Sequence, residues 1–213
     1  MMPLEKDISC KNIFSHLEIN KPLGVYLNDN NVKTLRIAEA SKYPHVTYFF
    51  DGGKELNLNN TDKIIIPRKD VKTYDLAPRM SADEITIKLL EVINNYDFVV
   101  LNYANCDMVG HTGNFKKTIE AVRCVDENIE MLYKKLPNDY LLIVTSDHGN
   151  AELMYDNNEN VITSHTSNPV PFIICDKNYK LKEKGCLGNI APTILDIMGI
   201  QKPVEMTEDS LIL

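Results

Sequence analysis

Short apolar runs alternate with polar segments along most of the chain. Five of these runs predict β-strands, because each is rich in β-branched, aliphatic or aromatic side chains and is bounded by turn-forming or polar residues. The five lie at residues 45–50, 63–66, 97–102, 140–145 and 170–175. Their apolar residues are continuous and do not alternate with polar ones, which is typical of strands buried on both faces of a sheet.

Helical spacing is found between these runs. The sequence Ser81-Ala-Asp-Glu84 has the pattern of a capping box, in which the serine and the glutamate satisfy backbone N–H groups of the first turn. Helices are predicted to follow it, to run from about Val32 to Lys42, and to run from near Ile190 to Gly199. A longer helix is predicted over 115–136, with one apolar stripe formed by Ile119, Val122, Ile129, Leu132 and Leu136.

Strands that alternate with helices predict an α/β fold, a mostly parallel sheet with helices on both faces. Ligands of such sheets bind at the carboxyl ends of the strands. Polar residues are concentrated just after two predicted strands, at 102–107 and 146–150, and just before a third, at 39–42. These three segments are therefore the candidate functional loops.

Length and charge narrow the class of protein. The 213 residues correspond to one large domain or at most two small ones. The 23 basic and 30 acidic side chains give a formal net charge of −7, which argues against a basic nucleic-acid interface. No apolar run is long enough to predict a membrane span. We therefore expect no nucleic-acid partner and no membrane partner.

The cysteines and the first residues indicate the compartment. Five cysteines, an odd number at irregular spacing, do not form a disulfide framework and predict a reducing environment. The first residues lack the continuous apolar segment and the cleavage site of a secretory signal. Together these features predict a cytoplasmic protein.

The spacing of Asp107 and His111 is the first feature that predicts chemistry. Four residues separate them, so a helical segment would place both side chains on one face, where they could share a divalent metal ion. The alternative is an aspartate that caps a helix, beside a loosely packed histidine. The pattern alone does not decide between the two.

Asp147 and His148 follow a predicted buried strand directly. A turn at Gly149 would let both side chains approach one ion, although a simple turn capped by the aspartate gives the same pattern. Ser146 beside them resembles a nucleophile, but no base or oxyanion hole is predicted near it. We therefore interpret Ser146 as a turn residue.

His165 precedes the last predicted strand, and taken alone it fits a surface loop. Taken with the other two segments, it brings the candidate ligands to two aspartates and three histidines in loops near strand ends. That set matches a two-metal centre that lacks some ligands, and two such ions can clamp a transferring phosphoryl group.

Lys42 lies between a predicted helix and a predicted strand. Its ammonium group could neutralise phosphate charge at the site. The alternative is a solvated lysine at the carboxyl end of a helix, where the helix dipole favours a positive charge. Arg36 and Glu39 on the same predicted helix are interpreted as a structural pair.

The order of these residues resembles that of the cofactor-independent phosphoglycerate mutases, a family of the alkaline phosphatase superfamily. The resemblance covers residue 21 to the C-terminus and rests on several long motifs: LRIAEASKYPHVTYFFDGG, YDLAP followed by MSA, LNYANCDMVGHTGN, TSDHGNAE, SHTSNPVPF and IAPTILDIMGI. Residues 1–20 match less clearly. The resemblance therefore implies that residues 21–213 form a metal-binding, alkaline phosphatase-like domain that is incomplete.

The resemblance also implies roles for the candidate residues. Members of the family hold two manganese ions and interconvert 3-phosphoglycerate and 2-phosphoglycerate in glycolysis through a phosphoserine. By the resemblance Lys42 contacts the substrate or the transferred phosphoryl group, and zinc or cobalt could replace manganese. The first ion is assigned Asp107, His111 and His165, and the second is assigned Asp147 and His148.

The sequence departs from the family in three major features and one minor one. It has no G-N-S-E-V-G-H segment, which carries the nucleophilic serine, no amino-terminal metal-binding aspartate, and no inserted transferase domain with the arginines that bind phosphoglycerate. Neither Ser9 nor Ser15 lies in a matching motif, and Arg79 stands where the family usually has glutamate. We expect the chain alone to have little or no mutase activity, and to need a complementary amino-terminal chain.

Two other functions stay open at this point. The chain could be another metal-dependent phosphatase, phosphodiesterase or phosphopentomutase of the same superfamily, although the motif around Lys42 resembles the mutases specifically. It could also be a non-catalytic metal-binding scaffold or the partner of a second polypeptide. A piece of a larger domain is further expected to expose an unpaired sheet edge or an apolar patch.

Overall fold

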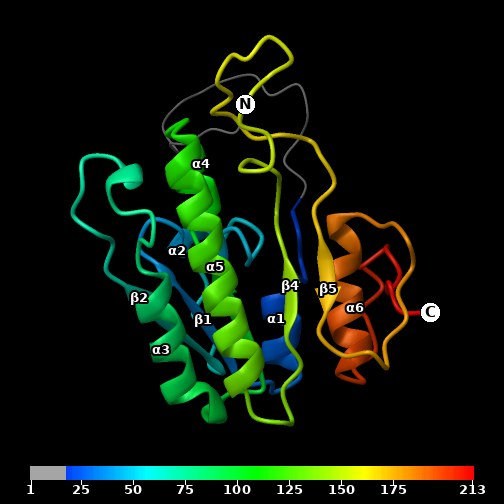
Figure 1. Ribbon diagram of the computed structural model, residues 1–213. Helices are drawn as coiled ribbons and strands as arrows, with labels where there is room; N and C mark the ends of the chain where they lie inside the picture. The colour runs from blue at the N-terminus through cyan, green and yellow to red at the C-terminus, as the bar shows by residue number, and fades with distance from the viewer. Residues whose placement is uncertain (1–17) are drawn as a thin grey trace, which may run out of the picture.

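The computed structural model describes residues 18–213, in which helices alternate with strands (Figure 1). Most of the segment 1–20 therefore lies outside the described residues, and the predicted domain division stays a prediction. In chain order the elements are α1 (Leu23–Asp29), β1 (Thr34–Glu39), α2 (Tyr43–Val46), β2 (Thr61–Ile66), the short 3₁₀ helix η1 (Tyr74–Leu76), α3 (Ala82–Val92), η2 (Ile93–Asn95), β3 (Phe98–Asn102), α4 (Asn105–Gly110), α5 (Phe115–Lys135), β4 (Ile143–Thr145), β5 (Phe172–Ile174), η3 (Leu187–Asn189) and α6 (Ile190–Ile197).

Three strands form a parallel sheet in the order β2-β1-β3. The central strand β1 is in register with both neighbours, so that Thr34 aligns with Thr61 on one side and with Phe98 on the other. β4 and β5 form a separate antiparallel pair. The predicted α/β class with a mostly parallel sheet is confirmed.

Helices cover both faces of the sheet. Leu35 and Ile37 of β1 pack under α3, η2 and α5, which lie together in front of the strands in Figure 1. This core contains the buried side chains Leu35, Ile37, Ile85, Leu89, Ile93 and Leu132. A second core joins α1 and α6 against Phe98 and contains Leu23, Leu27, Val32 and Leu195. Removing this apolar surface from water is the main force that holds the layers together.

The region from Val32 to Phe50 differs from its prediction. The expected helix over 32–42 is wrong, because its centre forms β1, and the expected strand over 45–50 is wrong, because α2 and a series of turns occupy it. All six residues of β1 are buried, the charged ones included. Its central place in the sheet, with hydrogen bonds to strands on both sides, outweighs the helix propensity of its charged residues.

The two charged side chains of β1 find separate partners. Arg36 donates to the backbone oxygen of Val46 at 2.9 Å and pairs with Asp51 at 3.4 Å. Glu39 accepts from the Ser41 hydroxyl at 2.7 Å and from the Ser81 backbone N–H at 3.0 Å. The expected pair between Arg36 and Glu39 is therefore wrong, since side chains three positions apart on a strand point to opposite faces of the sheet.

The remaining strand predictions are confirmed in position. β2 and β3 cover the runs at 63–66 and 97–102 almost completely. β4 and β5 are shorter than the runs at 140–145 and 170–175, because only three residue pairs align, from Ile143 with Ile174 to Thr145 with Phe172.

The other helix predictions are confirmed in extent and corrected in detail. The stripe of α5 that faces the core is Thr118, Ala121, Cys124, Asn128 and Leu132, whereas the predicted Ile119 and Val122 are exposed. At the start of α3 no capping box forms, because the Ser81 hydroxyl donates to the oxygen of Pro67 at 2.8 Å. Glu39 receives the Ser81 backbone N–H in its place. Long-range packing therefore replaces the local cap.

Two simpler observations complete the fold. No helix among residues 18–213 combines the length and the apolar character that crossing a bilayer requires. The four cysteines in this part of the chain, Cys106, Cys124, Cys175 and Cys186, are all unpaired.

Candidate metal centre

The helix α4 places Asp107 and His111 on the same face. It begins three residues after the end of β3, and its last turn is closed by the His111 backbone N–H, which donates to the oxygen of Asp107 at 3.0 Å. As a result, Nε2 of His111 lies 3.0 Å from Oδ1 of Asp107. The helical geometry on which the spacing argument depended is therefore present.

His165 reaches the same point from a distant loop. Its Nε2 lies 3.1 Å from Oδ1 of Asp107 and 3.0 Å from Nε2 of His111. Separations of this size fit neighbouring ligands of one ion bound at about 2.0–2.2 Å. Across residues 18–213, Asp107, His111 and His165 are the one set of three His, Cys, Asp or Glu residues whose donor atoms converge in this way.

The surroundings orient two of these donors. Nδ1 of His111 lies 2.6 Å from the backbone oxygen of Thr163, so Nδ1 carries the proton and the lone pair of Nε2 faces the centre. Asn150 donates from Nδ2 to Oδ1 of Asp107 at 2.9 Å. The donor set, one carboxylate oxygen and two imidazole nitrogens, suits manganese, zinc and cobalt alike.

Lys42 contacts the other oxygen of the same carboxylate. Its Nζ lies 2.6 Å from Oδ2 of Asp107, and the two side chains are only 9% and 15% exposed. Burial would raise the pKa of Asp107, but the hydrogen bond and the charge of Lys42, together with His111 and Asn150, lower it. The alternative of a solvated lysine at a helix end is therefore wrong.

Asp147 and His148 lie next to this centre, just after β4. The His148 ring stacks on the His165 ring with centroids 3.7 Å apart, and Oδ2 of Asp147 lies 3.6 Å from Nε2 of His148. Within residues 18–213 no third donor joins them to form a second cluster of three. Ser146 donates to the backbone oxygen of His148 at 2.8 Å, as a turn residue does.

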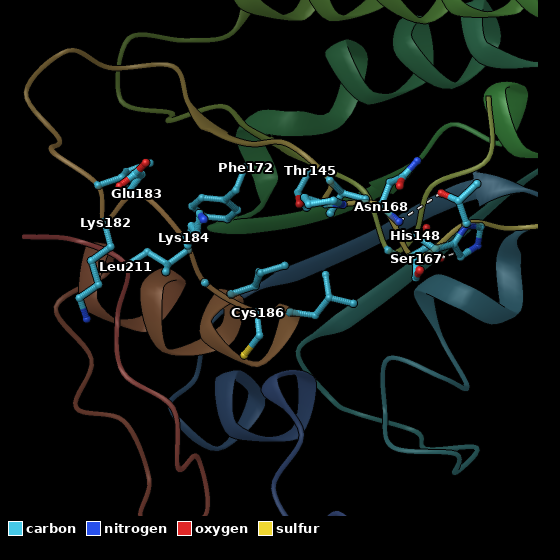
Figure 2. A pocket seen from close by; sticks show the side chains of 18 residues that line it. Thr145, His148, Ser167, Asn168, Phe172, Lys182, Glu183, Lys184, Cys186 and Leu211 are labelled. Carbon is cyan, nitrogen blue, oxygen red and sulfur yellow. Dashed lines mark hydrogen bonds and ion pairs between the residues drawn. The ribbon is translucent and has the colours of Figure 1, made fainter. Parts of the chain in front are cut away.

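A cavity of about 460 Å³ lies on the far side of His148. Figure 2 shows His148, Ser167 and Asn168 at one end and Lys182 and Glu183 at the other. The cavity therefore starts at the second pair of candidate ligands and extends along β5 toward the start of α6.

His45 is a residue near the site that the sequence reasoning missed. It lies on α2, where its backbone N–H donates to the oxygen of Lys42 at 3.1 Å. Burial first and the charge of Lys42 second lower the pKa of His45, while Asp147 and Asp107 act in the opposite direction. Pro44 was the available signal, because proline is favoured in the first turn of a helix and disfavoured inside a sheet.

Arg79 lies away from the centre. It makes two hydrogen bonds of 2.8 Å to Asp83 and one of 2.8 Å to Glu127, all on the exposed side of α3 and α5. This departure from the family motif therefore lies in a surface contact, away from the candidate metal ligands.

Comparison with known proteins agrees with the geometry. The profile of the Metalloenzyme superfamily matches residues 13–202. The chain is 50% identical over all 213 residues to the 2,3-bisphosphoglycerate-independent phosphoglycerate mutase of Mycoplasma genitalium, of which it covers 42%. It is 52% identical over 193 residues to the enzyme of that name from Mycoplasmoides gallisepticum. That match covers 89% of this chain and 38% of the relative.

A solved structure shows the same fold. Phosphoglycerate mutase of Leishmania mexicana, determined at low cobalt concentration, superposes with a TM-score of 0.81 at 32% identity. The match covers 88% of this chain and 38% of the Leishmania chain. The chain thus spans about two fifths of the length of the relatives that it matches.

Proposed function

The chain belongs to the Metalloenzyme superfamily, and we propose that it forms the metal-binding part of a 2,3-bisphosphoglycerate-independent phosphoglycerate mutase, which interconverts 3-phosphoglycerate and 2-phosphoglycerate. The observation that carries this proposal is the convergence of Asp107, His111 and His165 beside Lys42. The identity of 50% to the Mycoplasma genitalium mutase along the whole chain supports it.

In this proposal Asp107, His111 and His165 hold one divalent ion, with Mn²⁺ as the expected metal. Asp147 and His148 contribute to a second ion that needs further ligands from outside the described residues. Metal ions at such a centre neutralise the charge of a transferring phosphoryl group. The chain itself supplies the ligands, the carbonyl of Thr163 that fixes the tautomer of His111, and Asn150, which orients Asp107.

Lys42 is proposed to bind the phosphoryl group of the substrate. Its ammonium group already lies at the centre, held by Oδ2 of Asp107, on the side away from the two histidines that face Oδ1. A point charge there can contact a phosphate oxygen without displacing a metal ligand. Lys42 is therefore the one residue of this part for which we propose direct contact with the substrate.

Catalysis is proposed to need a second polypeptide segment. The five residues of β3 are apolar except the last, yet all are partly exposed, and the residues of β4 are partly or fully exposed. Among the described residues β3 pairs only with β1, and β4 pairs only with β5. A complementary amino-terminal chain that covers these strands would bring the serine nucleophile and the arginines to the ligands at their carboxyl ends.

The test is reconstitution. The chain is mixed, in the presence of Mn²⁺, with the part of the Mycoplasma genitalium mutase that has no counterpart in it. We expect conversion of 3-phosphoglycerate to 2-phosphoglycerate only in the mixture, and no activity when His111→Ala replaces the wild-type chain. Conversion by the chain alone, at a rate that scales with its concentration, would contradict the proposed division of the site. Release of inorganic phosphate without isomerisation would indicate a phosphatase.

A further inference from the structure

Glu152 lies outside the metal ligands but is hydrogen-bonded to the segments that carry them. It belongs to the turn that follows β4, four residues after His148. Oε2 accepts the backbone N–H of Asn150 at 2.6 Å, and Oε1 accepts the Thr166 hydroxyl together with Nδ2 of Asn168 at 3.0 Å. One carboxylate therefore receives donors from two loops that are separated in sequence.

The two loops are the ones that bring the distant ligands to the centre. Asn150 lies between His148 and Glu152 and orients Asp107 through its side chain. Thr166 is the neighbour of His165, and its backbone N–H also donates to the oxygen of Gly149 at 2.9 Å. Glu152 thus connects the turn after β4 to the loop of His165.

Gly149 makes this connection sterically specific. A Cβ atom at Gly149 would lie 2.3 Å from Oε1 of Glu152 and 2.3 Å from Oγ1 of Thr166. The Glu152 carboxylate and the Thr166 hydroxyl therefore pack directly on the backbone of Gly149. Any larger residue at this position would push the two loops apart.

His165 has few other constraints of its own. Its side chain is 48% exposed, and it contacts Asp107, His111 and the ring of His148. An exposed loop histidine keeps several rotamers unless its backbone is fixed. Residues that fix a ligand in this way typically change metal affinity by 10–100-fold when they are replaced.

We propose that Glu152 is a positioning residue, which holds the loop of His165 against the turn of Asp147 and His148 and so preorganises the site for its first metal ion. The inference rests on the proposed metal centre and adds to it a residue that touches neither metal nor substrate. Glu152 acts through its hydrogen bonds with Thr166 and Asn168 and not by coordinating the metal ion.

The test is Co²⁺ binding to the full chain. Isothermal titration calorimetry measures the affinity, and the visible absorption of the bound ion reports its coordination. In Glu152→Gln a single oxygen must replace two, so either Asn150 or the Thr166 and Asn168 pair loses its acceptor. We expect about tenfold weaker Co²⁺ binding and an altered absorption spectrum. Thr166→Val removes the hydrogen bond between Thr166 and Glu152 from the other side, so it should also weaken Co²⁺ binding. The double variant should bind Co²⁺ no more weakly than the single variants.

Asp156→Asn is the matched control, because Asp156 is a carboxylate of the neighbouring loop whose donors, Asn158 and Asn160, belong to its own turn. It should bind Co²⁺ like the wild type. Wild-type affinity and spectrum in Glu152→Gln, or an equal loss in Asp156→Asn, would overturn the inference while the metal centre stands. If Glu152→Gln does not fold, Thr166→Val decides. A wild-type chain that binds no Co²⁺ would overturn both proposals.

Discussion

At the scale of single residues, the site depends on Asp107, because its two oxygens face different partners. Oδ1 lies near His111 and His165, while Oδ2 contacts Lys42 at 2.6 Å. The ammonium group thus neutralises a carboxylate that a metal ion would also neutralise. Two cations that share one anion repel each other, so Lys42 and the metal compete in part for Asp107.

Replacing Lys42 by methionine tests this competition. Lys42→Met keeps the apolar length of the side chain but removes the charge, and we expect Mn²⁺ to bind about tenfold more tightly, which corresponds to roughly 1.4 kcal/mol. Isothermal titration with Mn²⁺ measures the change. Lys88→Met, an exposed lysine of α3 paired with Glu91, should leave the affinity unchanged. Weaker binding in Lys42→Met would mean that the lysine supports the metal.

Much of the site could be predicted from single residues, and some of it could not. The four-residue spacing of Asp107 and His111, and the positions of Asp147 and His148 at a strand end, were readable because they follow from local geometry and from the sheet rule. The role of Glu152 could not be predicted, because its carboxylate oxygens accept hydrogen bonds from two loops that meet only in the tertiary fold. His45 was missed for a different reason, because its run was interpreted as a strand in spite of Pro44.

At the scale of elements, the fold shows where periodicity misleads. β1 carries Arg36 and Glu39 at positions that a surface helix would expose, yet both are buried. Their partners, Asp51 and Ser81, are distant in sequence, so no local pattern predicts these contacts. The strands β2 and β3 and the helices α3, α5 and α6 were predictable, because their apolar patterns agree with their final environment.

The contact between α3 and α5 has a pH-dependent part. Asp83 accepts two hydrogen bonds from Arg79 and one from the buried Asn128 at 3.0 Å. The hydrogen bonds of Arg79, opposed by burial and aided by Asn128, lower the pKa of Asp83 below its ordinary value near 3.8. A carboxyl with a lowered pKa in the folded state stabilises the fold above the pKa of the unfolded chain, and this contribution disappears as the pH falls through the folded pKa.

Asp83→Asn should therefore lower the free energy of unfolding at pH 7 by at most about 1 kcal/mol, because the pair with Arg79 is substantially exposed to solvent. The difference from the wild type should vanish below the folded pKa of Asp83. Urea unfolding at a series of pH values from 7 into the acid range measures it. Glu91→Gln, on an exposed pair of the same helix, should change stability by less. A difference that grows toward acid pH would contradict the assigned direction.

At the scale of the whole molecule, two sheets meet at the candidate metal centre. The parallel sheet contributes α4, which follows β3, and the antiparallel pair contributes the turn after β4 and the loop before β5 (Figure 1). Among residues 18–213, β2 and β3 are the outer strands of the parallel sheet, and β4 and β5 pair only with each other. Apolar side chains are also exposed on α5 and in the segment between β4 and β5, among them Phe115, Val122 and Tyr155.

The central claim is that Asp107, His111 and His165 together bind a divalent cation. The most direct test is a calorimetric titration with Mn²⁺ that compares the wild-type chain with His111→Ala. We expect about one tightly bound ion per chain in the wild type and at least a hundredfold weaker binding in the variant, because one of three ligands is lost. A wild-type chain that binds no Mn²⁺, or a variant that binds it equally well, would contradict the claim.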